Sequence, residues 1–322
     1  AYGSISQYYR HDQISIDGVG DSTRQSLLSS YADATAIYRK RDTEHTVQAV
    51  VSNNYDFIED RDRPSTNRIY EMYYQASSRN NGSFLKLGRQ KLRVGAALNR
   101  FDGLALGYQL SPDYHITLLG GAPVEIDNKT SVNDHKVFYG LVFDTGTFLR
   151  NWNANLFHFH QTVDGIDDRT DTGVELFYRD AANLFYGLVD YESQYNVINT
   201  ININANTQVS QDLSLHMTAY MLQTPLMSTS NALIGQSVTS IEELNKTMNI
   251  EQIRQLARDR TSKNQTATVG ATKQLNKNYQ VNIDITAASN DGTVASGGVP
   301  AQPSTGTNTF LSGQLVANSL FS

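Results

Sequence analysis

The sequence predicts an all-β fold, an up-and-down antiparallel transmembrane β-barrel of about 16 strands with one helical loop. Three observations predict it. Apolar and polar residues alternate with period two along many segments, no run of about 18 apolar residues is present, and short and long links mostly alternate between the expected strands. The mean hydropathy of -0.43 fits such a barrel, because its apolar residues occupy only every second position. We expect one barrel domain over residues 1–322, either complete or part of a longer chain.

The alternation assigns each segment two faces of different character. In residues 280–287, polar residues at even positions alternate with Val281, Ile283, Ile285 and Ala287. In LSLHMTAYM, one face carries Leu213, Leu215, Met217, Ala219 and Met221. A soluble β-sandwich alternates too, so both architectures remain open on this evidence alone. In a barrel, Val281→Arg should impair membrane assembly far more than Asn282→Arg, because only position 281 would face lipid.

The lengths of the links favour the barrel. Short links are expected at 41–43, 80–82, 111–113, 145–147, 181–182 and 275–277. Long links are expected at 60–67, 92–102, 124–133, 163–168, 225–262 and 290–307, while the link after Tyr195 should be long and is not. Outer-membrane barrels keep short periplasmic turns and longer extracellular loops, whereas a Greek-key sandwich has no reason to keep that parity.

The link TSIEELNKTMNIEQIRQLARDR contains helical signals over about residues 239–260. Ser240 and Glu243 have the spacing of a capping box, and apolar residues follow at helical intervals. Either one helix breaks at Asn249 or two short helices abut there. The segment is then a self-packed extracellular cap, a constriction inside the barrel, or a site for a soluble partner.

Polar residues opposite the apolar face are expected to line the lumen, where they either set selectivity or form internal salt bridges in a solvated wall. The charged members are Asp33, Arg39, Glu71, Glu175, Arg179, Asp190 and Glu192. The stretch from Asp164 to Asp171 is expected to be a solvated link, with calcium binding as the alternative. His158 and His160 share a face, but no carboxylate has matching spacing, so no metal site is predicted.

No catalytic chemistry, cofactor or nucleic-acid partner is predicted. The chain has no Cys, and its Ser, His and Asp residues are not set in a nucleophile motif. A glycine-rich phosphate loop between a strand and a helix is also absent from the sequence.

The stretch GRQKLRVGAALNRFDGLALGY concentrates cations in a chain of net charge -6. Arg89 and Lys91 are expected to end one strand, Arg93 and Arg100 to lie in the following link, and Gly103 to begin the next strand. Asp102 is close enough in sequence to pair with Arg100. These cations belong at the rim or in the lumen, because an arginine facing lipid at mid-depth costs about 2 to 4 kcal/mol. They either pair with acids or guide an anionic chain.

The segment LGRQKLRVGAALNRFDGLALGYQLSP resembles the C-terminal barrel of large bacterial tetratricopeptide-repeat proteins. The resemblance continues in residues 240–286 and 295–321, so that it covers about a third of the chain in all. Gly88-Arg89-Gln90 and Arg100-Phe101-Asp102-Gly103 also look like elements of alginate-export porins. The resemblance implies an outer-membrane pore for exopolysaccharide and a periplasmic repeat scaffold. This chain contains no 34-residue helical repeat.

We therefore expect a channel in a Gram-negative outer membrane, in contact with its lipid, that passes a hydrophilic solute through a lumen narrowed by loops. An anionic polysaccharide is one such solute. The alternative is a plugged, anchoring barrel that binds partner proteins in the cell envelope. A loop-borne enzyme is the least favoured hypothesis.

Overall fold

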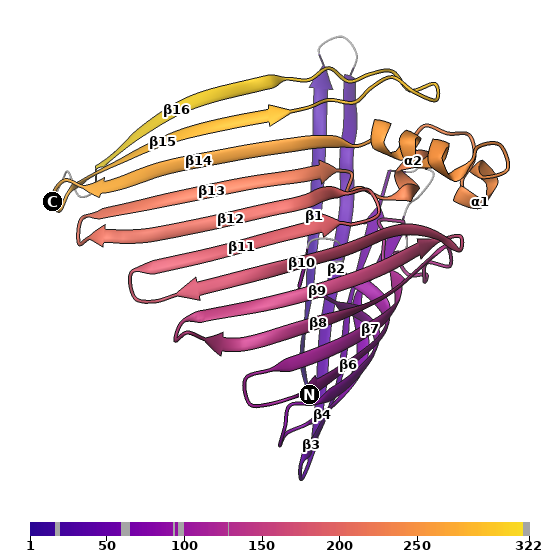
Figure 1. Ribbon diagram of the computed structural model, residues 1–322, viewed down its shortest axis with the longest axis horizontal. Helices are drawn as coiled ribbons and strands as arrows, with labels where there is room; N and C mark the ends of the chain where they lie inside the picture. Colours follow the sequence, from indigo (N-terminus) through magenta and orange to yellow (C-terminus); the bar gives the residue numbers. More distant parts are fainter. Residues whose placement is uncertain (17–19, 59–64, 93, 96–99, 128, 318–322) are drawn as a thin grey trace. The chain divides into compact units, whose positions relative to one another are not determined.

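The computed structural model describes residues 1–16, 20–58, 65–92, 94–95, 100–127 and 129–317. Sixteen strands follow one another in a single sheet in the order of the sequence, and the strand pairs are antiparallel (Figure 1). This up-and-down order confirms the predicted all-β class and strand number. A Greek-key order would place strands distant in sequence side by side, and the sheet has no such crossover in its described part.

The first eight strands are β1 (Tyr2–Ile16), β2 (Gly20–Lys40), β3 (Thr43–Asp56), β4 (Ser65–Ser78), β5 (Phe84–Lys91), β6 (Arg100–Gln109), β7 (His115–Pro123) and β8 (Lys136–Phe148). The others are β9 (Trp152–Val163), β10 (Ile166–Arg179), β11 (Asn183–Glu192), β12 (Val197–Ser210), β13 (Leu213–Thr224), β14 (Ser262–Gln274), β15 (Tyr279–Asn290) and β16 (Gly306–Ala317). Between β13 and β14 lie the 3-10 helix η1 (Thr229–Leu233) and the helices α1 (Ile241–Leu244) and α2 (Ile250–Asp259). No described helix is long and apolar enough to cross a membrane.

The chain forms two compact units, which we describe separately. The first unit comprises residues 1–93, 98–112 and 117–134, and the second comprises residues 94–97, 113–116 and 135–322. The expectation of a single barrel domain over residues 1–322 stays a prediction.

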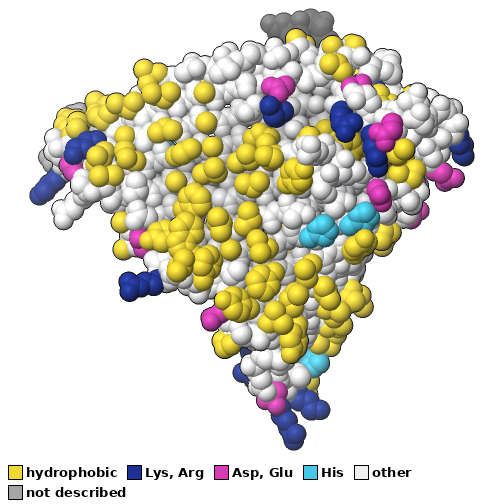
Figure 2. Space-filling view, viewed as in Figure 1, with side chains coloured by type: hydrophobic (Ala, Val, Ile, Leu, Met, Phe, Trp, Pro, Cys, Tyr) yellow, Lys and Arg dark blue, Asp and Glu magenta, His cyan; other side chains and the backbone are white. Residues whose placement is uncertain are grey.

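Each unit has one apolar and one polar face, as the alternation predicts. In the second unit Met217, Val269, Ile285 and Leu311 form one cross-strand row, and all four side chains are exposed. Their chain neighbours on the other face include Thr268 and Thr286, whose hydroxyl groups are 2.8 Å apart. Figure 2 shows hydrophobic side chains spread over the strands of this unit. Exposed apolar area on this scale is unusual for a protein in water.

The short links lie where expected, with one exception. The links after the even-numbered strands are residues 41–42, 79–83, 110–114, 149–151, 180–182, 211–212 and 275–278. The turn predicted at 145–147 is wrong: these residues lie inside β8, at a shift of register between Asp144 and Thr147. The chain reverses instead at Leu149 and Arg150, both of which have positive φ. A β-bulge and a turn both favour glycine, so the sequence around Gly146 has the pattern of a turn although it forms an irregularity within β8.

Several links after the odd-numbered strands are long, notably residues 124–135, 225–261 and 291–305. The link predicted as long at 163–168 is wrong, because only Asp164 and Gly165 separate β9 from β10. Their φ values of 49° and 77° suit a two-residue hairpin turn. The link after β11 is short, as the sequence indicates, and comprises residues 193–196.

The helical link folds as two helices with a shared core, which we call the cap (residues 225–261). Asn249 begins α2 in a reciprocal capping box with Gln252, whereas Ser240 only accepts a bond from the Glu243 N–H. Ile241, Leu244, Ile253, Leu256 and Ala257 form the core of the cap. That core also packs on residues of β9 and of the link after β11, so the cap sits at the end of the strands in its unit (Figure 1).

Candidate functional site

The predicted lumen residues of the second unit share one face of the sheet. Asp190 lies across from Gly173 and Glu175 lies across from Leu188, so Glu175, Asp190 and Glu192 point to the same side. Arg179 has the same parity at the far end of β10. The predicted face is therefore correct for these four residues, while their role as a lumen wall stays a prediction.

Four buried carboxylates gather on this face at the end of the strands that carries the cap. We call Asp168, Asp171, Asp190 and Glu192, together with Arg169, the acidic cluster. Each of the four carboxylate residues is at most 1% exposed. Arg169 Nε lies 3.4 Å from Asp171 Oδ2, and Lys136 Nζ lies 3.7 Å from Asp168 Oδ2. The expectation of a solvated link between Asp164 and Asp171 is thus wrong for Asp168 and Asp171, because the cap covers them.

Hydrogen bonds attach the cap to the acidic cluster. Asp168 Oδ1 accepts bonds from the Ser230 backbone N–H at 2.8 Å and from the Ser230 hydroxyl at 2.6 Å. Asn199 links the two parts, since its Nδ2 donates to Asp171 Oδ1 at 3.1 Å and its Oδ1 accepts from the Met227 N–H at 2.8 Å. The polar wall and the cap therefore form one connected network.

The short link after β11 supports the same network. Glu192 accepts bonds from the backbone N–H groups of Thr170, Gln194 and Tyr195, which satisfies its carboxylate. The Tyr195 hydroxyl donates to Thr229 Oγ1 at 3.0 Å. Burial raises the pKa of Tyr195 to about 12, so this hydroxyl keeps its proton at neutral pH.

Part of the cationic stretch also lies on this polar face. The Gly95 N–H donates to Glu175 Oε1 at 3.0 Å, and Asn155 Nδ2 donates to the other carboxylate oxygen at 3.1 Å. A Cβ atom at Gly95 would lie 3.2 Å from the Phe157 ring, so the backbone approaches the wall closely. Two separate links, one at Gly95 and one at the cap, therefore cover the wall of β9–β11.

The polar wall of β12–β15 is more open. Asn206, Thr218 and Thr266 are exposed on that face, and the side chains beside them are mostly neutral. Asp284 is an exception, and it bonds to His216 Nε2 at 2.7 Å. This part of the wall offers amide and hydroxyl groups to water and little net charge.

In the first unit, strand register places Asp33, Val50 and Glu71 in one cross-strand row. Arg39 forms an exposed ion pair with Glu44 across the β2–β3 hairpin, and Lys91 Nζ lies 3.9 Å from Glu71. The Arg39–Glu44 pair matches the internal salt bridges that the sequence left open for the polar face, whereas Lys91 has the parity of Arg89 in β5, so its contact with Glu71 does not place it on that face.

Arg89 has a structural role. Its guanidinium donates to both oxygens of Asp102 at 2.7 Å and also to the backbone carbonyls of Ile69, Lys129 and Ser131. All five N–H groups of the side chain are thus engaged, and the residue is 5% exposed. The interaction ties residues 129–131 of a long link to β4–β6.

The ion pair between Arg89 and Asp102 differs from the sequence prediction, in which Asp102 pairs with Arg100 in a link. Arg100 and Asp102 both lie in β6, and Asp102 stands directly across from Arg89 in β5. The register sets Arg89 and Asp102 beside Leu87 and Leu104 on the exposed apolar face, so this geometry does not support a lumen role for them.

The other two arginines of the stretch are less informative. The Arg100 guanidinium carbon lies 5.3 Å from the centre of the Tyr70 ring, a cation-π distance. Arg93 lies outside the described residues.

Aromatic side chains flank the apolar face of the second unit. Trp152 contacts Tyr178 and Phe185 beside the short turns, with ring centres 5.0 and 5.8 Å apart. Near the other end, Tyr139 contacts His160 at 5.1 Å. His158 and His160 bond through Nδ1 to Thr172 and Thr170. Among the described residues, no three His, Asp or Glu side chains are arranged to hold a metal ion.

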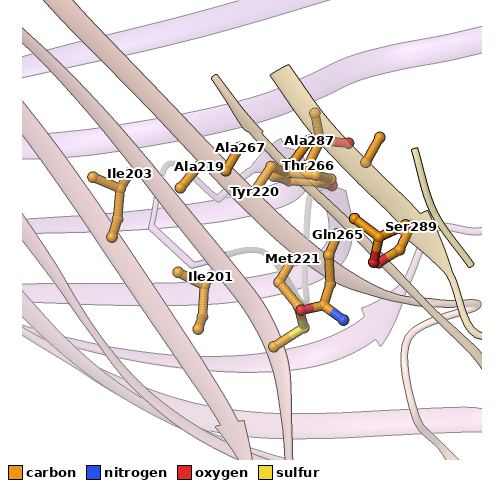
Figure 3. A pocket seen from close by; sticks show the side chains of 12 residues that line it. Ile201, Ile203, Ala219, Tyr220, Met221, Gln265, Thr266, Ala267, Ala287 and Ser289 are labelled. Carbon is orange, nitrogen blue, oxygen red and sulfur yellow. The ribbon is translucent and has the colours of Figure 1, made fainter. Parts of the chain in front are cut away.

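The same apolar face carries a shallow groove of about 470 Å³ (Figure 3). Ala219, Ala267 and Ala287 form a row of small side chains there, with Ile201 and Ile203 alongside. The groove belongs to the apolar side of the sheet and has few polar groups, so it is a poor site for a hydrophilic solute.

No protein-family model matches the sequence, and no curated protein sequence matches it. Solved structures that resemble the chain include an anion-selective porin from Comamonas acidovorans (11% identity, TM-score 0.42), covering 98% of this chain and 100% of that one. OccAB4 of Acinetobacter baumannii (8%, 0.48) covers 89% and 81%, and OprB of Pseudomonas putida (10%, 0.47) covers 98% and 92%. Identities of 8 to 11% with TM-scores below 0.5 assign no family.

Proposed function

We propose that the protein is an outer-membrane channel that passes a hydrophilic solute without chemistry. The observation that carries the proposal is the two-faced sheet, with exposed aliphatic side chains between aromatic flanks on one side and polar side chains on the other. A lipid-facing belt between aromatic girdles and a polar lumen wall have this arrangement in transmembrane β-barrels. The structure pairs sixteen strands in one sheet, and a barrel closed from that many strands would enclose a lumen wide enough for water.

The passage is narrowed at one end. The cap and the segment at Gly95 cover the polar wall of β9–β11, while Thr218 and Thr266 on the wall of β12–β15 remain exposed. This division supports a constricted channel in preference to a fully plugged barrel.

An exopolysaccharide is the solute that the sequence resemblance suggests, with a periplasmic tetratricopeptide-repeat protein as its scaffold. The neutral amide and hydroxyl groups of β12–β15 suit a carbohydrate chain. An anionic polysaccharide is less well served, because the N–H groups of Arg89 are fully engaged and Arg169 faces Asp171.

The plugged, anchoring barrel is the second candidate, and the complete burial of Asp168, Asp190 and Glu192 on the polar face favours it. Single-channel conductance of the folded protein in a planar bilayer separates the two functions. A channel gives stable openings. Asn199→Ala should increase their conductance or frequency, because it removes the bond from Asn199 to Asp171 in the wall and the bond to Asn199 from the Met227 N–H in the cap. A fully inserted protein that stays silent in wild type and variant would favour the plugged scaffold.

A further inference from the structure

Three neighbouring strands hold buried oxygen atoms that lack hydrogen-bond partners. They are both carboxylate oxygens of Asp190 in β11 and Thr200 Oγ1 in β12, which bond to no described residue, and Asp171 Oδ2 in β10, which accepts no hydrogen bond and has an ion-pair contact with Arg169 Nε at 3.4 Å. Asp190 and Thr200 stand directly across from each other in the β11–β12 register. Asp190 is 0% exposed and Thr200 is 1% exposed. Buried polar groups normally have partners, so three oxygen atoms without one, beside a carboxylate oxygen held only by an ion pair, call for a ligand.

The charges of the acidic cluster are also out of balance. Lys136 faces Asp168, which leaves Asp171, Asp190 and Glu192 with only Arg169 to oppose them. With every carboxylate ionised, the excess is two negative charges in a region without solvent contact. An uncompensated buried charge is strongly unfavourable, so the folded protein must either protonate carboxyl groups there or bind additional positive charge.

We propose that one divalent cation with the chemistry of calcium binds between Asp171, Asp190 and Thr200. Carboxylate and hydroxyl oxygens are the ligands that hard cations prefer, and a charge of +2 matches the excess. Glu192 contributes charge but not a ligand, since backbone N–H groups occupy its oxygens. The protein thus supplies two carboxylates and a hydroxyl, and water completes the coordination. Such a sparse ligand set predicts a Kd on the order of 10⁻⁴ to 10⁻³ M.

The site connects directly to the cap. Asn199 bonds to the other oxygen of Asp171 and to the Met227 N–H, so a cation that fixes Asp171 also fixes the start of the cap. Bound calcium should therefore slow hydrogen exchange in residues 225–261. The existence of the site does not depend on the proposed channel function.

The test measures calcium binding to the full chain folded in detergent micelles, by isothermal titration with calcium chloride and by terbium luminescence. We expect one ion per chain, with binding weakened at least about tenfold in Asp190→Asn, because ligand-shell changes have effects of that size. The matched control is Asp284→Asn, which removes a carboxylate from the same face outside the acidic cluster and should bind like wild type. Thr200→Val preserves the shape of the side chain and removes only the hydroxyl ligand. It replaces Asp190→Asn as the test variant if Asp190→Asn does not fold, and it should also bind calcium more weakly than wild type.

Three results would overturn the proposal. The wild type could fail to bind calcium up to about 10 mM, ten times the weakest affinity of this class. A folded Asp190→Asn or Thr200→Val variant could bind as tightly as wild type. Asp284→Asn could lose binding as completely as Asp190→Asn, which would indicate diffuse attraction to the acidic wall. Conductance is a separate readout, so a silent barrel that binds calcium supports the site and refutes only the channel.

Discussion

Replacing Ile285 with arginine tests which face of the sheet meets lipid. Ile285 lies in the middle of β15, is 55% exposed, and stands between Val269 and Leu311 on the apolar face. An arginine on the lipid side at mid-depth costs about 2 to 4 kcal/mol, which lowers the folding equilibrium constant about 30-fold to 700-fold. Thr286→Arg is the matched control on the opposite face. It loses a hydroxyl pair with Thr268, worth about 1 kcal/mol, and keeps its charge in water.

The depth of the position sharpens this prediction. Val281 lies four residues before Ile285, about 13 Å along the strand, and its cross-strand partner is Lys273. In a barrel that spans the membrane, position 281 is therefore expected near the membrane surface, where an arginine costs only about 0 to 1 kcal/mol. The structure thus shows Ile285 to be a better test of the lipid face than Val281.

The assay is refolding into phosphatidylcholine vesicles across a urea series, followed by gel mobility and by the fluorescence of Trp152, the single tryptophan of the chain. We expect the folding yield to fall in the order wild type, Val281→Arg, Ile285→Arg. Equal damage from Thr286→Arg and Ile285→Arg would refute the assignment of faces.

Three further predictions concern individual contacts. Arg89→Ala leaves the Asp102 carboxylate without its buried partner and should lower the free energy of unfolding by about 3 to 5 kcal/mol in urea titrations; an unchanged midpoint would show that the pair contributes little. Ile253→Ala opens a cavity in the cap and should destabilise it by about 2 to 5 kcal/mol, seen as faster proteolysis within the cap while the strands stay resistant. Asp180 accepts bonds from the Tyr178 hydroxyl and then from backbone N–H groups, which hold its pKa below the ordinary value. The stabilisation from the Asp180 carboxylate is therefore complete above about pH 4 and is lost as the pH falls through the lowered pKa. Asp180→Asn cannot ionise at this position, so its free energy of unfolding should fall less steeply than that of the wild type when the pH is lowered in this range.

Sequence pattern predicts the faces of this sheet well and the ends of its strands less well. Period-two alternation places Glu175, Asp190 and Glu192 on the polar side, because a strand fixes that parity locally. Asp164-Gly165 carries a strong turn signal, but the acidic residues that follow it resemble a solvated link, and this hides the hairpin in the sequence. The same resemblance conceals the burial of Asp168 and Asp171, because the cap that bonds to their network comes much later in the chain.

Pairing across strands is harder to predict than the face of a single strand. The contact between Arg89 and Asp102 depends on the register of β5 and β6, which in turn depends on where the intervening link ends. If β6 began at Gly103, as the sequence predicts, Asp102 would lie in a link and could pair with Arg100. Because β6 begins at Arg100, Asp102 instead lies within the strand and pairs with Arg89 on the adjacent strand. A local pattern holds no information on that register.

The order of the sheet has a consequence for folding kinetics. Every strand neighbours the strand before it in sequence, so each pairing closes a loop between consecutive strands and the entropy of closing most of these loops is small. The cap is the largest interruption, because residues 225–261 separate the paired strands β13 and β14. Assembly can therefore proceed hairpin by hairpin on either side of the cap, and the joining of β13 to β14 is the step expected to be slowest among these pairings.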